Sequence, residues 1–189
     1  MGNEKKLQLR DGEQILWQGQ SEPFALMDQG TRGKILAKWI GSVVAAVVIL
    51  VVYYTMNHEK KIGVAIAVLA IAALLIVSPF MERKKIVGSR YYVTNQRAIM
   101  DLSGGDVFFI NVEDIDGMKV VGDVAEKECV VIHSILFEEI YKQLRWRACH
   151  PKAVESSSEQ GKVMGLVFYN LKDAQAAAAA LEKSGVVKV

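Results

Sequence analysis

Cysteine, proline and net charge are all scarce in this chain. Its 189 residues include two cysteines and three prolines, and 23 lysines and arginines nearly balance 21 aspartates and glutamates. Two cysteines do not make a disulfide scaffold, and the spacing of Cys129 and Cys149 fits neither a redox CxxC pair nor a zinc ribbon. A reducing location that faces the cytosol is the simplest interpretation.

The domain that follows the apolar part of the chain is also neutral. From Glu82 to the last residue, 15 basic residues balance 15 acidic ones. A nucleic-acid-binding domain usually carries a clear basic excess. We therefore expect no nucleic-acid partner.

The motifs of common enzymes are missing as well. The sequence has no glycine-rich phosphate loop, no GxSxG and no HExxH. Cys129, His133, Cys149 and His150 are residue types that bind zinc, but adjacent side chains on a strand point to opposite faces, which separates the last two. The pair Glu138–Glu139 diverges for the same reason. We expect a protein that is not an enzyme, with no catalytic residue, no metal site and no cofactor.

Two long apolar runs are the strongest feature that is present. Trp39–His58 and Ile62–Met81 contain no Asp, Glu, Lys or Arg. About 20 residues of helix span roughly 30 Å, the hydrocarbon thickness of a bilayer. Apolar residues occur on every side of both runs, so an amphipathic surface helix does not fit. The pattern predicts a transmembrane hairpin within residues 36–81, with spans at about 39–57 and 62–81.

Basic residues are distributed unevenly around this hairpin. Eight lie on the side of the termini and two, Lys60 and Lys61, lie in the connection. The eight are Arg32, Lys34, Lys38, Arg83, Lys84, Lys85, Arg90 and Arg97. Lysine and arginine accumulate on the cytoplasmic side of membrane proteins. We therefore expect a multi-pass protein of the cytoplasmic (inner) membrane with both termini in the cytoplasm, residues 1–35 being a cytoplasmic segment without a cleaved signal peptide.

The spans themselves contain no charged residue, which is unusual for an ion or proton pathway. Small residues recur at Gly41 and Ala45 and again at Gly63 and Ala67. Such spacing lets helices approach closely. We attribute it first to packing within the hairpin and second to a homo-oligomer.

Short apolar stretches alternate with turn residues in the domain, residues 82–189. The expected strands are 90–94, 97–102, 106–112, 118–121, 129–132 and 163–169. Residues 135–147 fit either a helix face or one face of a long strand, and we favour a strand because the surroundings are β. A helix is expected from an N-cap at Asn170 to a stop at Gly185. The fold class is therefore α+β, a transmembrane hairpin followed by an antiparallel sandwich or barrel that a C-terminal helix closes.

Three segments give this architecture a family resemblance. They are Leu9–Gly19 (LRDGEQILWQG), Tyr92–Ile99 (YVTNQRAI) and Leu166–Asp173 (LVFYNLKD). Together they resemble the bacterial membrane-anchored pleckstrin-homology-like (PH-like) family, whose members often carry two spans before the domain. The resemblance covers nearly the whole chain and departs most in Val120–Gly161.

The domain segregates its charges, which gives the candidate surface residues. Residues 83–97 carry five bases and no acid, and residues 142–152 carry four bases and no acid. A base beside an anionic leaflet contributes about 1 kcal/mol. The candidate membrane-surface residues are Arg83, Lys84, Lys85, Lys142, Arg145 and Arg147, of which the first three also fit a topology signal alone. Trp17 is expected to be the buried anchor of a strand or clamp that the N-terminal segment forms against the domain.

These observations predict a non-enzymatic, membrane-anchored binding or scaffold protein. Its cytoplasmic domain is expected to bind a peptide, a protein or an anionic lipid headgroup at the surface of the bilayer. Inositide specificity is not supported, because only Arg90 and Arg97 stand on the first hairpin of the domain, where eukaryotic relatives carry a basic motif. The alternative is a small subunit of a membrane transport or export assembly.

Overall fold

The computed structural model describes residues 7–28, 30–56, 61–150 and 159–189. Contacts between residues divide the chain into two compact units. One unit is Leu26–Arg83, and the other combines the residues up to Ala25 with Lys84–Val189. The helical unit is therefore an insertion between two parts of the second unit.

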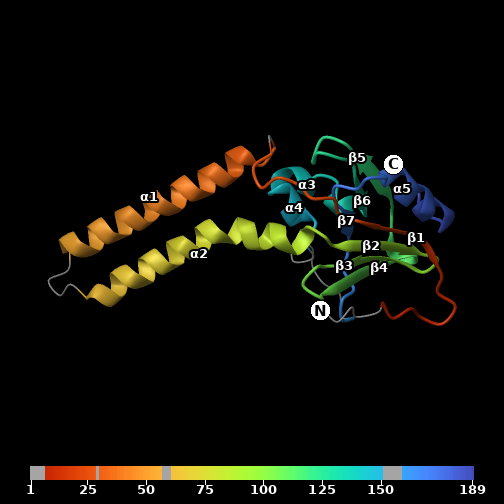
Figure 1. Ribbon diagram of the computed structural model, residues 1–189, viewed down its shortest axis with the longest axis horizontal. Coiled ribbons are helices and arrows are strands. Elements are labelled where there is room, and N and C mark those ends of the chain that lie inside the picture. Colours follow the sequence, from red (N-terminus) through yellow and green to blue (C-terminus); the bar gives the residue numbers. More distant parts are fainter. Residues whose placement is uncertain (1–6, 29, 57–60, 151–158) are drawn as a thin grey trace. The chain divides into compact units, whose positions relative to one another are not determined.

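The helical unit is a hairpin of two long helices, α1 (Arg32–Met56) and α2 (Ile62–Ile86), which run side by side in opposite directions (Figure 1). Both are long and apolar enough to cross a membrane. Each has 25 residues and extends beyond the expected span. Few of their side chains are buried within the hairpin, so most of the apolar surface points outward. The connecting residues 57–60 lie outside the described part of the chain.

Aromatic and polar contacts join the ends of the two helices that are far from their connection. The Trp39 ring stacks on Phe80 with centroids 5.9 Å apart, and its Nε1 donates to the carbonyl of Ile76 at 3.0 Å. Lys38 Nζ donates to the hydroxyl of Ser78. These contacts fix the register of one helix against the other.

In α2, Ser78 satisfies a backbone carbonyl that Pro79 leaves without its helical partner. Proline has no N–H, so the carbonyl of Leu75, four residues earlier, loses its helical partner. The hydroxyl of Ser78 donates to that carbonyl at 3.1 Å. The helix thus continues through the proline with this acceptor satisfied.

The second unit contains two antiparallel sheets. The first has the order β1-β2-β3-β4 and the second has the order β5-β6-β7. The strands are β1 (Ile15–Gln20), β2 (Arg90–Thr94), β3 (Arg97–Asp101), β4 (Val107–Asn111), β5 (Met118–Val121), β6 (Cys129–Ile132) and β7 (Leu166–Phe168). The strands expected at 90–94, 97–102, 106–112, 118–121 and 129–132 are present. β7 is shorter than the predicted 163–169.

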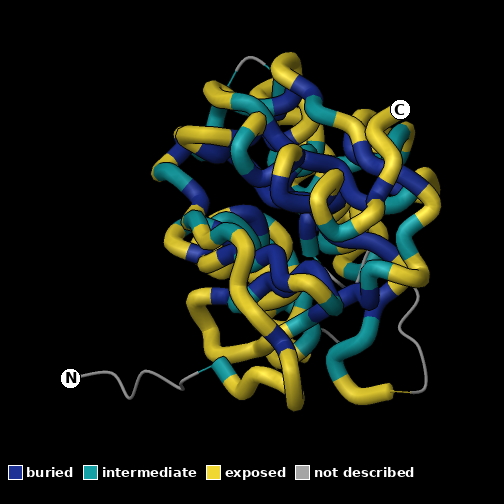
Figure 2. Tube along the Cα trace, turned by 90° about the vertical axis from the view of Figure 1, so that its right-hand side faces the viewer, coloured by how far each residue is buried: buried dark blue, intermediate teal, exposed yellow. Residues whose placement is uncertain are grey.

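The core lies between these sheets, where buried positions gather inside and exposed turns lie outside (Figure 2). Tyr91 and Val93 alternate with more exposed residues on β2 and are fully buried, as expected for side chains on one face of a strand. The Tyr91 ring stacks on Phe168 of β7 at 4.8 Å. Phe24 extends this cluster through edge contacts with Tyr169 at 4.9 Å.

Helix α5 (Ala174–Lys183) packs against strands of both sheets. Its N-cap is Asp173, whose carboxylate accepts from the N–H of Ala176 at 3.0 Å, so the prediction of Asn170 was wrong. Asn170 instead adopts a φ of 53° and its buried amide bonds to Glu22 and Lys127. At the other end, Gly185 has a φ of 98°. The N–H of Gly185 bonds to Glu182 and that of Val186 to Leu181, which is a Schellman motif.

The segment 135–147 is helical, so the predicted strand was wrong. It forms a 3-10 turn (Ser134–Leu136) and the short helices α3 (Glu139–Lys142) and α4 (Arg145–Ala148). A strand that buried Leu136 and Ile140 would have placed Glu138 and Lys142 on the same face. In the helical form these two charges pair at the surface, 3.2 Å apart with i,i+4 spacing.

Candidate functional site

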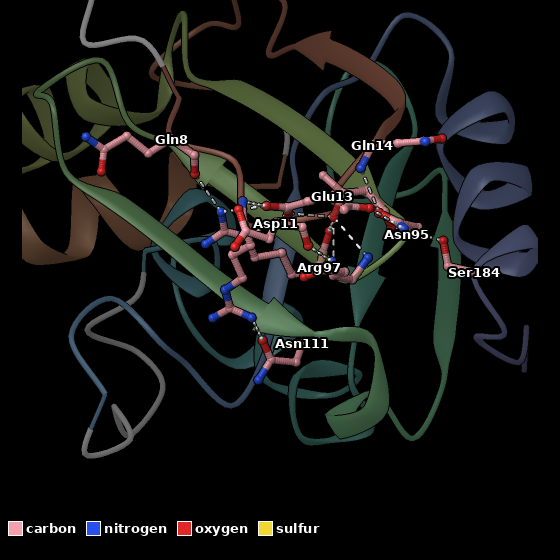
Figure 3. Close-up of polar contacts among 12 residues, drawn as sticks. Gln8, Asp11, Glu13, Gln14, Asn95, Arg97, Asn111 and Ser184 are labelled. Carbon is pink, nitrogen blue, oxygen red and sulfur yellow. Dashed lines mark hydrogen bonds and ion pairs between the residues drawn. The ribbon is translucent and has the colours of Figure 1, made fainter.

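A buried ion pair ties the N-terminal segment to the first sheet. Glu13 lies just before β1 and Arg97 begins β3. Arg97 Nε is 2.8 Å from Glu13 Oε1, and Arg97 Nη2 is 3.0 Å from Oε2 (Figure 3). The Glu13 side chain is fully buried and that of Arg97 is 10% exposed. A bidentate geometry of this kind fixes the orientation of both groups.

Neighbouring groups complete the hydrogen bonding of this carboxylate. The Thr94 hydroxyl donates to Oε1 at 2.8 Å and the N–H of Arg10 donates to Oε2 at 2.7 Å. Burial by itself raises the pKa of Glu13, but the bonds from Arg97, Arg10 and Thr94 outweigh it and hold the pKa below its ordinary value. The carboxylate is therefore charged under ordinary conditions, and its role is structural support.

Side chains of the turn between β2 and β3 form hydrogen bonds with the backbone of the same N-terminal segment. Asn95 accepts from the N–H of Gln14 at 2.8 Å and donates to the carbonyl of Gly12 at 3.1 Å. Gln96 donates to the carbonyl of Asp11 at 3.0 Å. Two of the segments that carry the family resemblance thus bind one another, and we call residues 10–14 with Thr94–Arg97 the clasp.

Phe109 of β4 lies beside the clasp. Its ring centroid is 5.0 Å from the guanidinium carbon of both Arg10 and Arg97. Arg10 also donates to Asn111 at 3.0 Å. An open polar pocket of about 390 Å³ adjoins these groups. It is lined by Arg10, Asn95, Gln96, Asn111, Val112 and Glu113.

The clasp changes the interpretation of the basic residues on the first hairpin. Arg97 is committed to Glu13 in the interior and does not present its charge to a ligand. Arg90, by contrast, is exposed and faces a second open pocket of about 300 Å³ together with Gln18, Gln20 and Tyr92. Of the two, Arg90 is exposed and Arg97 is buried.

The predicted surface residues near the end of α2 lie where the domain begins. Lys84 and Lys85 are exposed and belong to the second unit, whereas the half-exposed Arg83 belongs to the helical unit. The Ser103 hydroxyl donates to the carbonyls of both lysines, at 2.9 and 3.1 Å. Because the last carbonyls of a helix lack helical partners, these bonds hold the end of α2 to the β3–β4 turn.

The other three predicted surface residues lie together on α3 and α4. Lys142 is exposed and pairs with Glu138. Arg145 is half-exposed and donates to the backbone carbonyl of Asp123. Arg147 is half-exposed as well. Glu138 thus balances the charge of Lys142, and a backbone carbonyl orients the guanidinium of Arg145.

Trp17 lies on the predicted N-terminal strand, but it is half-buried, and the expectation of a buried anchor was too strong. β1 pairs antiparallel with β2, with Trp17 opposite Val93. The indole stacks on Phe168 with centroids 6.0 Å apart and lies over Gly19, where an added Cβ would be 2.4 Å from the ring. Glycine at position 19 therefore leaves the space that the indole occupies.

The cysteines and histidines do not assemble a reactive centre in the described part of the chain. No group of three metal-binding side chains occurs there. Burial raises the pKa of the Cys129 thiol to about 12 and that of Cys149 well above its ordinary value, so neither is a ready nucleophile. His133 lies 3.7 Å from Asp116 in a surface pair.

Glu13 was missed at the level of sequence. An isolated acidic residue in a polar segment has no distinguishing pattern, and its partner is 84 positions away. The one available signal was that Leu9–Gly19 carries an acidic residue beside a turn and Tyr92–Ile99 carries a basic residue beside a turn.

Comparisons with known proteins add no relative. No family model matches the chain, no curated protein matches it, and no solved structure matches it.

Proposed function

We propose that the protein is a non-enzymatic, membrane-anchored binding module of the PH-like type. Its hairpin holds the second unit at the inner surface of the cytoplasmic membrane, where that domain binds a partner. The partner is a peptide or protein segment or an anionic lipid headgroup. The proposal combines the apolar hairpin, the neutral β-rich domain and the three segments that carry the resemblance.

The observation that carries the proposal is the way in which the hairpin is inserted. β1 precedes α1 and β2 follows α2, and these two strands pair with one another. Eleven residues separate Gln20 from Arg32, and three separate Ile86 from Arg90. Both ends of the anchor thus join neighbouring strands of one domain through short connections. This arrangement suits a module that works at the membrane surface and does not reach far from it.

A second candidate function is a small subunit of a transport or export assembly. It is favoured by the outward-pointing apolar surface of α1 and α2, most of which has no partner within the hairpin. Lipid can cover that surface, and so can helices of another subunit.

Mild solubilisation from native membranes distinguishes the two. We expect a binding module to migrate as a monomer or a small oligomer of the chain, and a reporter fused after Val189 to be protected from protease in intact cells. We also expect protease added outside the cells to cleave the chain within residues 57–61. A stable larger complex that persists when the domain is proteolysed would favour the assembly, and reversed accessibility would overturn the orientation.

A further inference from the structure

An open pocket of about 390 Å³ lies beside the clasp. Three parts of the domain meet around it. They are the N-terminal segment with Arg10, the β2–β3 turn with Asn95 and Gln96, and residues 111–113 at the end of β4. Of the described lining residues, only Val112 is apolar. Pockets for small molecules are lined mostly by apolar and aromatic side chains, so this lining is more typical of contact with a polar protein segment.

Hydrogen bonds hold the walls of the pocket in place. The side chain of Asn111 is buried, and its oxygen accepts from Arg10 at 3.0 Å (Figure 3). Its amide nitrogen donates to Asp114 at 3.1 Å. The N–H of Val112 donates to the backbone carbonyl of Gln96 at 2.9 Å. Because these groups are already ordered, a ligand would lose little affinity to the ordering of the site.

Arg10 keeps donors for such a ligand. Its guanidinium carbon lies 5.0 Å from the centroid of the Phe109 ring. Its Nη1 donates to Asn111, and its Nη2 donates to Glu159 at 3.2 Å. Each of these nitrogens carries two hydrogens, and the side chain forms no further hydrogen bond with a described residue. One hydrogen on each nitrogen is therefore left for an acceptor such as a peptide carbonyl.

Glu113 supplies a charge that has no counter-charge among the described residues. Its carboxylate is exposed and forms no hydrogen bond or ion pair with any of them. The other charges nearby are matched, Arg10 by Glu159 at 3.2 Å and Asp114 by Lys162 at 2.9 Å. The pocket therefore carries an unbalanced negative charge, which a lysine or arginine side chain of a partner would neutralise.

The place of the pocket in the domain argues against a lipid ligand. α2 ends at Ile86, and β2 begins at Arg90. The turn at residues 95–96 follows the far end of β2, about 17 Å along the strand from its first residue. The unbalanced charge of Glu113 would also repel an anionic headgroup. A soluble protein segment fits both observations.

We propose that this pocket binds an exposed basic segment of a partner protein. A lysine or arginine side chain of the segment pairs with Glu113, and a backbone carbonyl beside it accepts from Arg10. The inference rests on the proposed function, because it names the class of partner that the membrane-anchored domain binds.

The test uses the full chain in a non-ionic detergent and labelled peptides with blocked ends, Gly-Ala-Xaa-Ala-Gly, in which Xaa is Lys, Gln or Glu. By fluorescence anisotropy, the wild-type chain should bind the Lys peptide about fivefold more tightly than the Gln peptide, the size expected of an exposed ion pair. The Glu peptide should bind most weakly. E113K should reverse this order. The control E126K changes the same charge on the connection between β5 and β6, where Glu126 is also exposed, and should keep the wild-type order.

Two further measurements locate the contacts. R10Q should weaken all three peptides alike, because they share the carbonyl that accepts from Arg10. A carbodiimide joins a carboxylate to an amine that touches it, so mass spectrometry should find the Lys peptide coupled to Glu113. E113Q, which should bind the Lys and Gln peptides equally, replaces E113K if the latter does not unfold cooperatively.

The same order of peptides in wild type and E113K would overturn the inference. So would no binding of the Lys peptide at millimolar concentration, or coupling at other carboxylates in place of Glu113. Displacement of the Lys peptide by a short-chain anionic lipid would also overturn it, since the pocket would then bind lipid. None of these results touches the solubilisation and protease experiments, so failure of this site is distinguishable from failure of the proposed function.

Discussion

Glu13 and Arg97 neutralise one another in a part of the domain from which water is excluded. Removing one member of such a pair leaves the other buried without a counter-charge, which usually costs several kcal/mol. We expect Glu13→Gln to lower the free energy of unfolding by about 3 kcal/mol. Lys127→Gln is the control, because Lys127 and Glu22 form a partly exposed pair at 3.7 Å that contributes less than about 1 kcal/mol. Denaturant unfolding of the solubilised chain measures both, and equal small losses would show that the pair does not support the fold.

The same pair makes stability depend on pH. The pKa of Glu13 in the folded protein lies below its ordinary value of 4.5 because of its bonds to Arg97, Arg10 and Thr94. Its contribution is therefore complete above about pH 4.5 and is lost as the pH falls towards the folded-state value. Asp114 and Asp116 have lowered pKa values too and keep part of this slope. Glu13→Gln should flatten the acid side of the stability profile, whereas Lys127→Gln should leave its shape unchanged.

Trp17 contributes through one face of its ring. The indole stacks on Phe168 but is only half-buried, so Trp17→Ala should cost about 2 kcal/mol, less than a fully buried tryptophan would. Gly19→Ala should also destabilise the domain, because its Cβ would displace the indole. In the Trp17→Ala background the second change should cost much less. Thermal unfolding of the three variants measures this coupling, and additive losses would contradict the contact.

At the scale of elements, the proline in α2 gives a test within the hairpin. Ser78→Ala removes the hydroxyl that donates to the Leu75 carbonyl beside Pro79 and accepts from Lys38. We expect a loss of about 1 kcal/mol, the range of polar contacts between membrane helices. Pro79→Ala returns a backbone N–H to that carbonyl, so Ser78→Ala should cost less in the Pro79→Ala background. Titration with a denaturing detergent, followed by circular dichroism, measures both costs, and equal values would show that the hydroxyl does not replace the missing N–H.

The predictability of each element followed the kind of pattern that the sequence carries. The two long helices are continuous apolar runs, and the strands at 90–101 are short apolar stretches between turn residues; both are local properties of the sequence. Residues 135–147 have apolar residues four apart, which fits both a helix and a strand. The charges at Glu138 and Lys142 decide between them, because a strand would have buried both. Weighing the charged positions together with the apolar ones would have favoured the helical form.

Local sequence patterns could not predict the clasp or the pairing of Val187–Val189 with the edge of β5. Glu13 meets Arg97 because β1 joins β2 in one particular register, and no local pattern fixes the pairing of strands so far apart. The Val187–Val189 pairing likewise depends on where α5 ends relative to β5. The sequence does supply the permissive residues, since Gly185 allows the turn and Gly117 allows the close approach.

At the scale of the whole molecule, the domain is discontinuous in sequence. A soluble form can therefore be made by joining Ala25 to Lys84 with a flexible linker of about ten residues, because Ser21 and Ser89 already bond to one another at 2.9 Å. We expect this form to unfold cooperatively. Residues 84–189 alone lack β1 and leave Arg97 without Glu13, so they should not. Calorimetry compares the two, and cooperative unfolding of the shorter fragment would show that the N-terminal segment is dispensable.

The joined form then separates a lipid partner from a peptide partner. If the domain rests on an anionic membrane, Arg145 and Arg147 should contribute about 1 kcal/mol each, so neutralising both to Gln should weaken binding to anionic vesicles about thirtyfold. The control neutralises Lys172 and Lys183, which are exposed, carry the same charge and lie beside and on α5, at the other end of the strands from α4 (Figure 1). Binding should fall steeply with salt, because exposed charges are screened within a Debye length, and neutral vesicles should not bind.

Since Arg145 already donates to the carbonyl of Asp123, a loss smaller than thirtyfold would mean that this bond competes with lipid. Equal binding of wild type and both double variants would remove the lipid surface as the partner and leave a peptide or protein segment as the remaining candidate.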